Sequence, residues 1–113
     1  MSIFYYLILV GSIVSISFAD VFIKKAGMSA HSFGGLLSNP WFLIAILLYL
    51  IQIIGFGYLF FSGAKLTMVG ITELVLYAVI IIGSGILLFH ESITITQAIG
   101  MVLAITGLIL INL

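Results

Sequence analysis

Residues 68–89 read MVGITELVLYAVIIIGSGILLF, an apolar run that contains a single charged side chain, Glu73. A helix of this length extends about 33 Å, enough to cross the roughly 30 Å hydrocarbon core of a bilayer. A carboxylate about one turn inside a bilayer costs about 2.5–3.5 kcal/mol on insertion scales, so such a group usually faces a cavity, a partner or a transported solute. The run therefore predicts a membrane-spanning helix, with Glu73 as its first candidate functional residue.

Three further apolar segments of similar length lie at residues 3–23, 40–61 and 95–113. A membrane span must satisfy its own backbone hydrogen bonds, which leaves helices or a closed barrel, and continuous apolar runs without alternation exclude the barrel. Only 5% of the residues are charged, against about 25% in soluble domains. We therefore expect an all-α polytopic protein of the cell membrane, with four transmembrane helices in one domain, 1–113.

The remaining composition excludes several classes of function. Three lysines balance three acidic residues, and no basic run exists that could bind nucleic acid. The chain has no cysteine, and His31 and His90 stand apart in predicted connections, so we expect no metal site. No Ser/His/Asp or Cys/His arrangement can be assembled. We expect neither an enzyme nor a cofactor.

The predicted helix boundaries carry ordinary capping patterns. The predicted connections are residues 24–39, 63–65 and 90–94. Asn39 before Pro40 is typical of a helix N-cap followed by proline in the first turn, and Thr94 or Thr96 is expected to cap the last helix. Connections this short predict that consecutive membrane helices run antiparallel.

The first predicted helix carries a face of small and weakly polar residues. Gly11, Ser12, Ser15 and Ala19 form this face, with spacings of three and four from Ser12 onwards. The pattern favours close helix packing of the small-xxx-small kind. The alternative is a wall of a solute path, in which the Ser15 hydroxyl meets the solute.

Near the end of the same helix, Asp20 and Lys24 stand four residues apart and can pair locally. With a cation so close, Asp20 is interpreted as a structural charge at the membrane interface and not as a substrate site.

The second predicted helix presents Tyr49, Gln52 and Phe56 on one face. Gln52 falls near the middle of the span, where its amide needs a hydrogen-bonding partner. That partner is either another helix or a substrate, and the sequence leaves both open.

On the third predicted helix, Tyr77 lies one turn beyond Glu73 on the same face. Its phenol could donate to the carboxylate, or its ring could stack on an organic cation. The alternative for Glu73 is a structural carboxyl bonded to a backbone or hydroxyl group.

The last predicted helix is nearly all aliphatic, and its small residues are Gly100, Ala104 and Gly107, again spaced four and three apart. Such a helix offers little to a solute and much to another helix. We interpret this face as a dimer contact or as tight packing within the subunit.

Short motifs in the second half of the chain carry a family resemblance. They are LFHE at 88–91, Ile93, Gln97, IGM at 99–101 and TG at 106–107, with FIKKA at 22–26 near the end of the first helix. This pattern resembles the drug/metabolite transporter superfamily, including EamA-like domains. Residues 99–113 also look like the final helix of small multidrug resistance proteins, which forms their dimer contact. The resemblance implies a homodimer, or a pair with a homologous subunit.

Two departures from the small multidrug resistance pattern affect the expected mechanism. The binding glutamate of their first helix falls on Ile16 here, and Leu76 and Tyr77 occupy the region of the tryptophan in their third helix. The four-helix subunits of aminoarabinose-lipid flippases are similar in size and share a His-Glu pair in the last hairpin. That similarity implies a lipid-linked sugar as an alternative substrate.

The sequence thus predicts a transporter that moves a small organic solute through a cavity between two copies, since transporter folds commonly arise from paired repeats. The predicted substrate-binding residues are Glu73, Tyr77, Gln52, Tyr49 and Ser15. The alternatives are a flippase subunit for a lipid-linked sugar and a non-transporting accessory membrane subunit. The expected partners are membrane lipid, the solute or lipid-linked substrate, and a second subunit.

Overall fold

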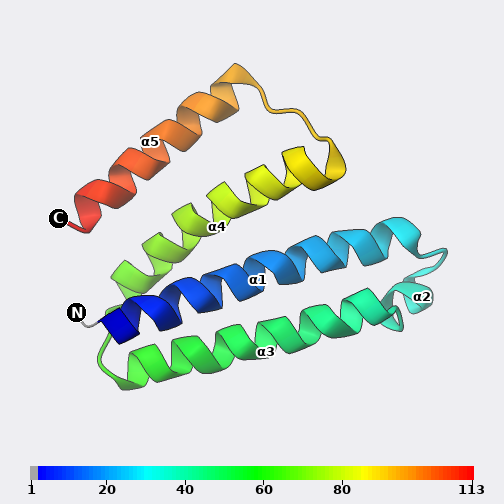
Figure 1. Ribbon diagram of the computed structural model, residues 1–113, viewed down its shortest axis with the longest axis horizontal. Coiled ribbons are helices and arrows are strands. Elements are labelled where there is room, and N and C mark those ends of the chain that lie inside the picture. The colour runs from blue at the N-terminus through cyan, green and yellow to red at the C-terminus, as the bar shows by residue number, and fades with distance from the viewer. Residues whose placement is uncertain (1–2) are drawn as a thin grey trace. The chain divides into compact units, whose positions relative to one another are not determined.

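The computed structural model describes residues 3–113, which form helices joined by short connections (Figure 1). The helices are α1 Ile3–Ser29, α2 Phe33–Leu37, α3 Pro40–Phe61, α4 Leu66–Phe89 and α5 Ile95–Ile111. All four predicted apolar segments are helical, so the all-α prediction is confirmed over the described residues.

Two details of the first connection were predicted wrongly. α1 continues past its expected end at residue 23 to Ser29, and the short helix α2 occupies part of the expected loop. The prediction took the end of the apolar segment, before Lys24, as the end of the helix. The backbone, however, continues its helical hydrogen bonding, as in the 3.0 Å bond from the Ala30 N–H to the Ala26 carbonyl. Lysine and alanine are both good helix formers.

The short helix α2 is started by a local cap. Ser32 has an extended backbone and its hydroxyl accepts a hydrogen bond from the Gly35 N–H at 3.0 Å. Its five residues include two glycines, which oppose helix formation, so the sequence pattern gave no indication of it.

The predicted caps are confirmed. The Asn39 side chain accepts from the Trp41 N–H at 2.9 Å, with Pro40 at the first helical position of α3. At the start of α5, the Gln97 N–H donates to the Thr94 hydroxyl at 3.1 Å, and the Thr94 N–H donates to the Gln97 side-chain oxygen at 2.9 Å. This reciprocal capping box selects Thr94 over Thr96.

The chain divides into two compact units, Met1–Gly63 and Ala64–Leu113. In the first, α1 and α3 run antiparallel and pack along their length (Figure 1). Its buried residues include Leu9, Ile13, Ala19, Ala26, Ala45, Phe56 and Leu59. In the second, α4 and α5 form a hairpin. One domain over 1–113 stays a prediction.

The close approach of α1 and α3 depends on Gly55. A side chain at Gly55 would place its Cβ 3.3 Å from the Cβ of Ser12 and in collision with the Ser12 hydroxyl. Ser12 and Ala19 are buried, whereas Ser15 is half-buried and Gly11 is exposed. The prediction of close packing through small residues is therefore confirmed for the Ser12 end of that face.

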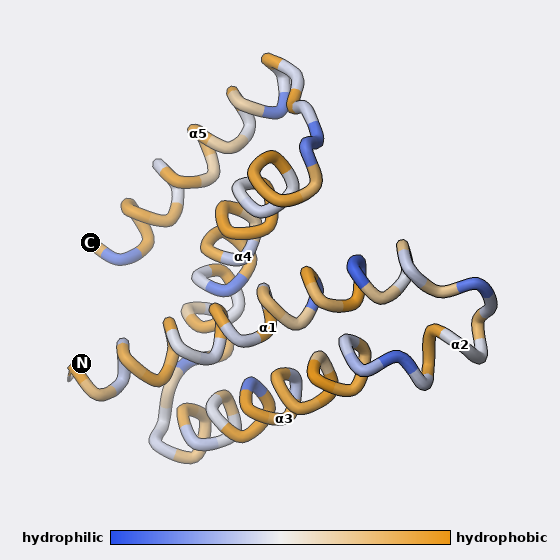
Figure 2. Tube along the Cα trace, turned by 45° about the vertical axis from the view of Figure 1, so that its right-hand side comes forward, coloured by the Kyte–Doolittle hydropathy of each residue, from blue (hydrophilic) through white to orange (hydrophobic). Residues whose placement is uncertain are grey.

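Three helices, α1, α3 and α4, are long and apolar enough to cross a membrane. Hydrophobic residues dominate all the long helices, and most hydrophilic residues lie near the connections (Figure 2). Large apolar side chains such as Ile54, Leu74 and Leu87 are exposed. Apolar surface on this scale suits hydrocarbon and not water. The fourth helix, α5, has 17 residues and is the shortest of the four predicted spans.

Candidate functional site

A hydrogen bond between Tyr49 and Asp20 joins the two long helices of the first unit. The Tyr49 hydroxyl, on α3, donates to the Asp20 carboxylate, on α1, and the pair is partly buried. This contact agrees with the interpretation of Asp20 as a structural charge. It also gives Tyr49, predicted as a substrate contact, a structural partner within its own hairpin.

Substitution Tyr49→Phe is expected to destabilise the first unit by about 0.6 kcal/mol, the average for an interhelical hydrogen bond in a membrane protein, and by no more than about 1.7 kcal/mol. The ring and its packing are retained, so only the donor is lost. Unfolding in mixed micelles, followed by circular dichroism, measures this change. The matched control is Tyr58→Phe on the same helix, whose side chain is half exposed. Equal stability of the two variants would show that the Tyr49 bond contributes nothing.

A hollow of about 490 Å³ lies along the face where α1 meets α3. It is lined by Leu7, Ile8, Gly11, Ser12, Ser15, Ile51, Ile54 and Gly55. Ser15, a predicted substrate contact, therefore does border open space. Gln52 is half-buried on α3 and is not among the lining residues. Apolar walls with two hydroxyls suit a hydrocarbon group better than a hydrated ion.

Glu73 lies in the second unit, about 10 Å along α4 from its start at Leu66. It is half-buried, and Tyr77 follows one turn later, also half-buried. Within residues 64–113, no group forms a hydrogen bond or ion pair with the Glu73 carboxylate. This arrangement contrasts with Asp20, which receives the Tyr49 hydroxyl. No structural partner for Glu73 is therefore found in its own hairpin.

The five predicted site residues thus fall in both units. Tyr49, Gln52 and Ser15 belong to the α1–α3 hairpin, and Glu73 and Tyr77 belong to α4. Tyr49 points to Asp20, whereas Ser15 borders the hollow. That all five line one binding site stays a prediction.

The small-residue face of α5 is not covered by any other part of the second unit. Nothing lies within 4 Å of the position that a Cβ would take at Gly100 or Gly107, and Ala104 is exposed. No described residue of α5 is buried. No neighbour in residues 64–113 therefore packs on these glycines. The dimer contact and tight packing within the subunit both stay predictions.

An aromatic and cationic cluster joins the last turns of α1 to the start of α3. The sequence analysis did not predict it. The Phe22 and Trp41 rings stack with centroids 5.3 Å apart, and the Lys25 ammonium lies 4.0 Å from the Trp41 ring centroid. Tryptophan and lysine gather at membrane interfaces, where an apolar body and a polar tip are both accommodated. Trp41 directly after Pro40, opposite the lysines of α1, was the pattern that could have indicated this anchor.

The architecture and these sites define the class of protein: an all-helical chain with three helices able to cross a membrane, as in a membrane-embedded protein. Comparison with protein families, with curated proteins and with solved structures finds no match to this chain.

Proposed function

We propose that the chain is a four-span transporter of the drug/metabolite transporter type, which acts as a dimer in the cell membrane and moves a small organic solute. The observation that carries this proposal is the Glu73 carboxylate, half-buried on an apolar helix and without a hydrogen bond or ion pair in its own unit. An ionisable group in such a place is by default a functional group that faces a solute path.

The fourth span is assigned to α5. Its 17 residues extend about 26 Å, at the short end of the range for a transmembrane helix. With four spans, one subunit can hardly enclose a solute path, so the cavity is proposed to form between two copies. The open face of Gly100, Ala104 and Gly107 supports a contact between α5 helices, because small residues let two backbones approach closely.

The double substitution Gly100→Leu with Gly107→Leu is expected to weaken the dimer by about tenfold or more, equivalent to roughly 1.4 kcal/mol. The added side chains would hold the two helix backbones apart. Energy transfer between labelled subunits diluted in liposomes measures the dissociation constant. The control is Val102→Leu with Ile109→Leu, which adds no bulk to the small-residue face. A dimer that tolerates both pairs equally would place the contact elsewhere.

A lipid-linked sugar is the second candidate substrate, and the hollow between α1 and α3 favours it. Its walls are mainly leucine and isoleucine, with Ser12 and Ser15 as the hydroxyl groups. A lipid tail could occupy such a hollow while the polar part meets the hydroxyls. The substrate's hydrocarbon would then never leave the apolar environment.

Reconstitution of the purified protein into liposomes tests the proposal. Uptake of radiolabelled organic cations and metabolites would support the solute transporter, and movement of a fluorescent polyprenyl-phosphate sugar between leaflets would support the flippase. Protein that moves neither, yet co-purifies with one membrane partner, would overturn both in favour of an accessory subunit. Empty liposomes and liposomes with heat-denatured protein are the controls.

A further inference from the structure

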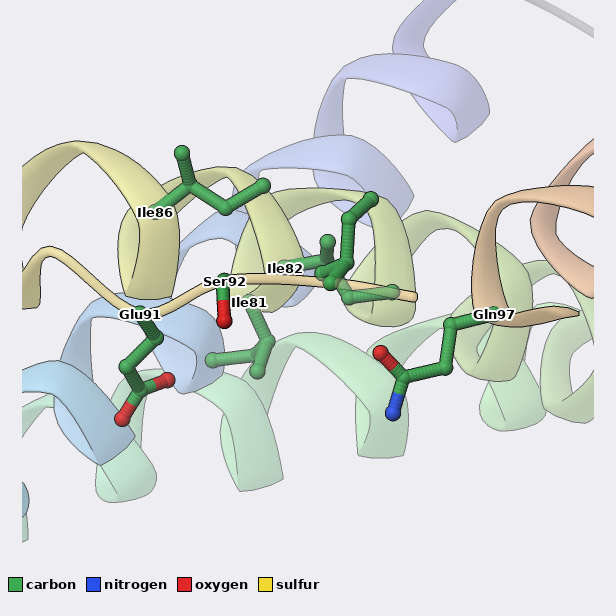
Figure 3. Close-up of a pocket in the computed structure, with 7 residues that line it drawn as sticks. Ile81, Ile82, Ile86, Glu91, Ser92 and Gln97 are labelled. Carbon is green, nitrogen blue, oxygen red and sulfur yellow. The ribbon is translucent and has the colours of Figure 1, made fainter. Parts of the chain in front are cut away.

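A separate pocket lies beside the connection between α4 and α5, at the end of α4 opposite Glu73. It encloses about 270 Å³. Its lining residues are Ile81, Ile82, Ile86, Glu91, Ser92, Ile93 and Gln97. All of them belong to the second unit. In Figure 3 the side chains of Glu91, Ser92 and Gln97 extend to the same side of the connection, with Ile81 between the carboxylate and the amide.

The turn after α4 places the Glu91 carboxylate against the helix. His90 takes the left-handed conformation, with φ 56°, and the Glu91 N–H donates to the Gly85 carbonyl at 3.0 Å. The chain therefore reverses, and Glu91 Oε1 lies 2.6 Å from the position that a Cβ would take on Gly85. Because Gly85 has no side chain, the carboxylate fits at the edge of the pocket.

The opposite edge of the pocket is fixed by the capping box of α5. The Gln97 side-chain oxygen accepts from the Thr94 N–H at 2.9 Å, which holds the amide beside the connection. An amide oxygen has two lone pairs, so it can accept a second hydrogen bond. The pocket thus presents a carboxylate, a hydroxyl and an amide oxygen above isoleucine walls.

The charges near the pocket indicate whether it binds a cation or an anion. Residues 66–113 contain no lysine or arginine. Lys65, the N-cap of α4, is about 36 Å away along the helix. Among the residues that line the pocket, Glu91 is the charged one, so the lining attracts a cation and repels an anion. A divalent metal is also disfavoured, because no group of three metal-ligating side chains occurs among residues 3–113.

We propose that this pocket binds an alkylammonium group. The ammonium is held by the Glu91 carboxylate with hydrogen bonds to the Ser92 hydroxyl and the Gln97 amide oxygen, and the attached hydrocarbon packs on Ile81, Ile82 and Ile86. This chemistry is shared by the amine headgroup of a membrane lipid and by a free amphiphilic amine. The site is separate from Glu73 and does not depend on the proposed transport function.

Nuclear magnetic resonance of glutamine side chains tests the site directly. The chain has two glutamines, Gln97 in the pocket and Gln52 in the other unit, so selective ¹⁵N labelling gives one reporter and one internal control. Titration of the full chain in a non-ionic detergent with octylammonium is expected to shift Gln97 saturably and to leave Gln52 unchanged. Octanol, which lacks the charge, is expected to bind at least about tenfold more weakly, a difference of about 1.4 kcal/mol. Equal affinity for the two probes would overturn the proposal.

Two variants distinguish the effect of the Glu91 charge from the effect of the position of its carboxylate. Glu91→Met keeps the length of the side chain and is expected to abolish the preference for octylammonium over octanol. Gly85→Ala keeps the charge but displaces the carboxylate, so it is expected to weaken octylammonium binding several-fold. Gly83→Ala is the matched control, since nothing lies within 4 Å of its added Cβ. Unchanged helical circular dichroism shows that each variant is folded, and unchanged preference in Glu91→Met would overturn the proposal.

The source of the amine is distinguished in lipid nanodiscs. If phosphatidylethanolamine is the natural ligand, the Gln97 signal is expected at its bound position in phosphatidylethanolamine discs and at its free position in phosphatidylglycerol discs. If the ligand is a free amine, Gln97 stays at its free position in both, and octylammonium shifts it equally in both. A Gln97 signal that responds to neither lipid nor octylammonium would overturn the alkylammonium site.

Discussion

Substitution Glu73→Gln is expected to reduce the initial rate of solute transport in proteoliposomes by about tenfold or more, a loss of at least roughly 1.4 kcal/mol in the transport step. Glutamine has nearly the shape of glutamate but carries no charge and cannot exchange a proton. The variant should therefore insert at least as well as the wild type, since the cost of a charge in the bilayer is removed. A pH dependence of transport that originates in this carboxylate should disappear with it.

The matched control is Thr72→Val, a nearly isosteric change at the neighbouring half-buried position of α4. It is expected to leave transport within about twofold of the wild type, because surface and packing changes of this size are usually within about 0.5 kcal/mol. Transport retained in Glu73→Gln, with its pH dependence unaltered, would remove the carboxylate from the mechanism. Glu73 would then be a structural group whose partner lies outside its own hairpin.

The choice of Glu73 over Asp20 rests on their different surroundings. Both acids interrupt apolar helices, and sequence alone gave each a plausible role. The structure shows Tyr49 donating to Asp20 across the α1–α3 hairpin, whereas no group of residues 64–113 donates to Glu73. A carboxylate that already links two helices is costly to recruit for a solute. The predicted site is therefore better centred on α4.

The helices themselves could be predicted because their causes are local. Apolar runs of about 20 residues define the spans, and caps such as Asn39 and Thr94 are set by residues within one turn. The errors have a local cause as well. Lys24 and Lys25 were assigned to the first connection, although a charge ends the apolar span and not the backbone hydrogen bonding. The helix α2 has five residues, too few for a repeat of 3.6 residues to be recognised in the sequence.

The contacts of the sites could not be predicted in the same way. Whether Gly55 meets Ser12, or Gly85 meets Glu91, depends on how far a helix is rotated and how closely the next segment approaches. Periodicity predicts on which face of a helix a residue lies, but not its distance from the neighbouring segment. A glycine in a helix can indicate a close contact with a neighbouring helix. Gly55 and Gly57 are equivalent in this respect in the sequence, but of the two only Gly55 contacts a neighbour.

Because Gly55 contacts a neighbouring helix and Gly57 does not, substitution of Gly55 has the largest expected effect on stability. Gly55→Leu is expected to destabilise the first unit by about 3 kcal/mol or more, at or above the upper end of the range for overpacking. Even a methyl group at Gly55 would collide with the Ser12 hydroxyl and lie 3.3 Å from its Cβ. Leucine therefore forces α1 and α3 apart. Gly57→Leu, which meets nothing within 4 Å, is expected to stay within about 0.5 kcal/mol of the wild type.

Unfolding in mixed micelles measures both variants, and a compensating change identifies the cause. Gly55→Ala alone should cost about 1–3 kcal/mol, and adding Ser12→Gly should restore part of that loss, because the colliding hydroxyl and its Cβ are removed together. Non-additivity of this sign is expected for residues in contact, because distant and independent substitutions add within about 0.3–0.5 kcal/mol. Equal stability of the Gly55 and Gly57 variants would mean that the helices are not closely packed there.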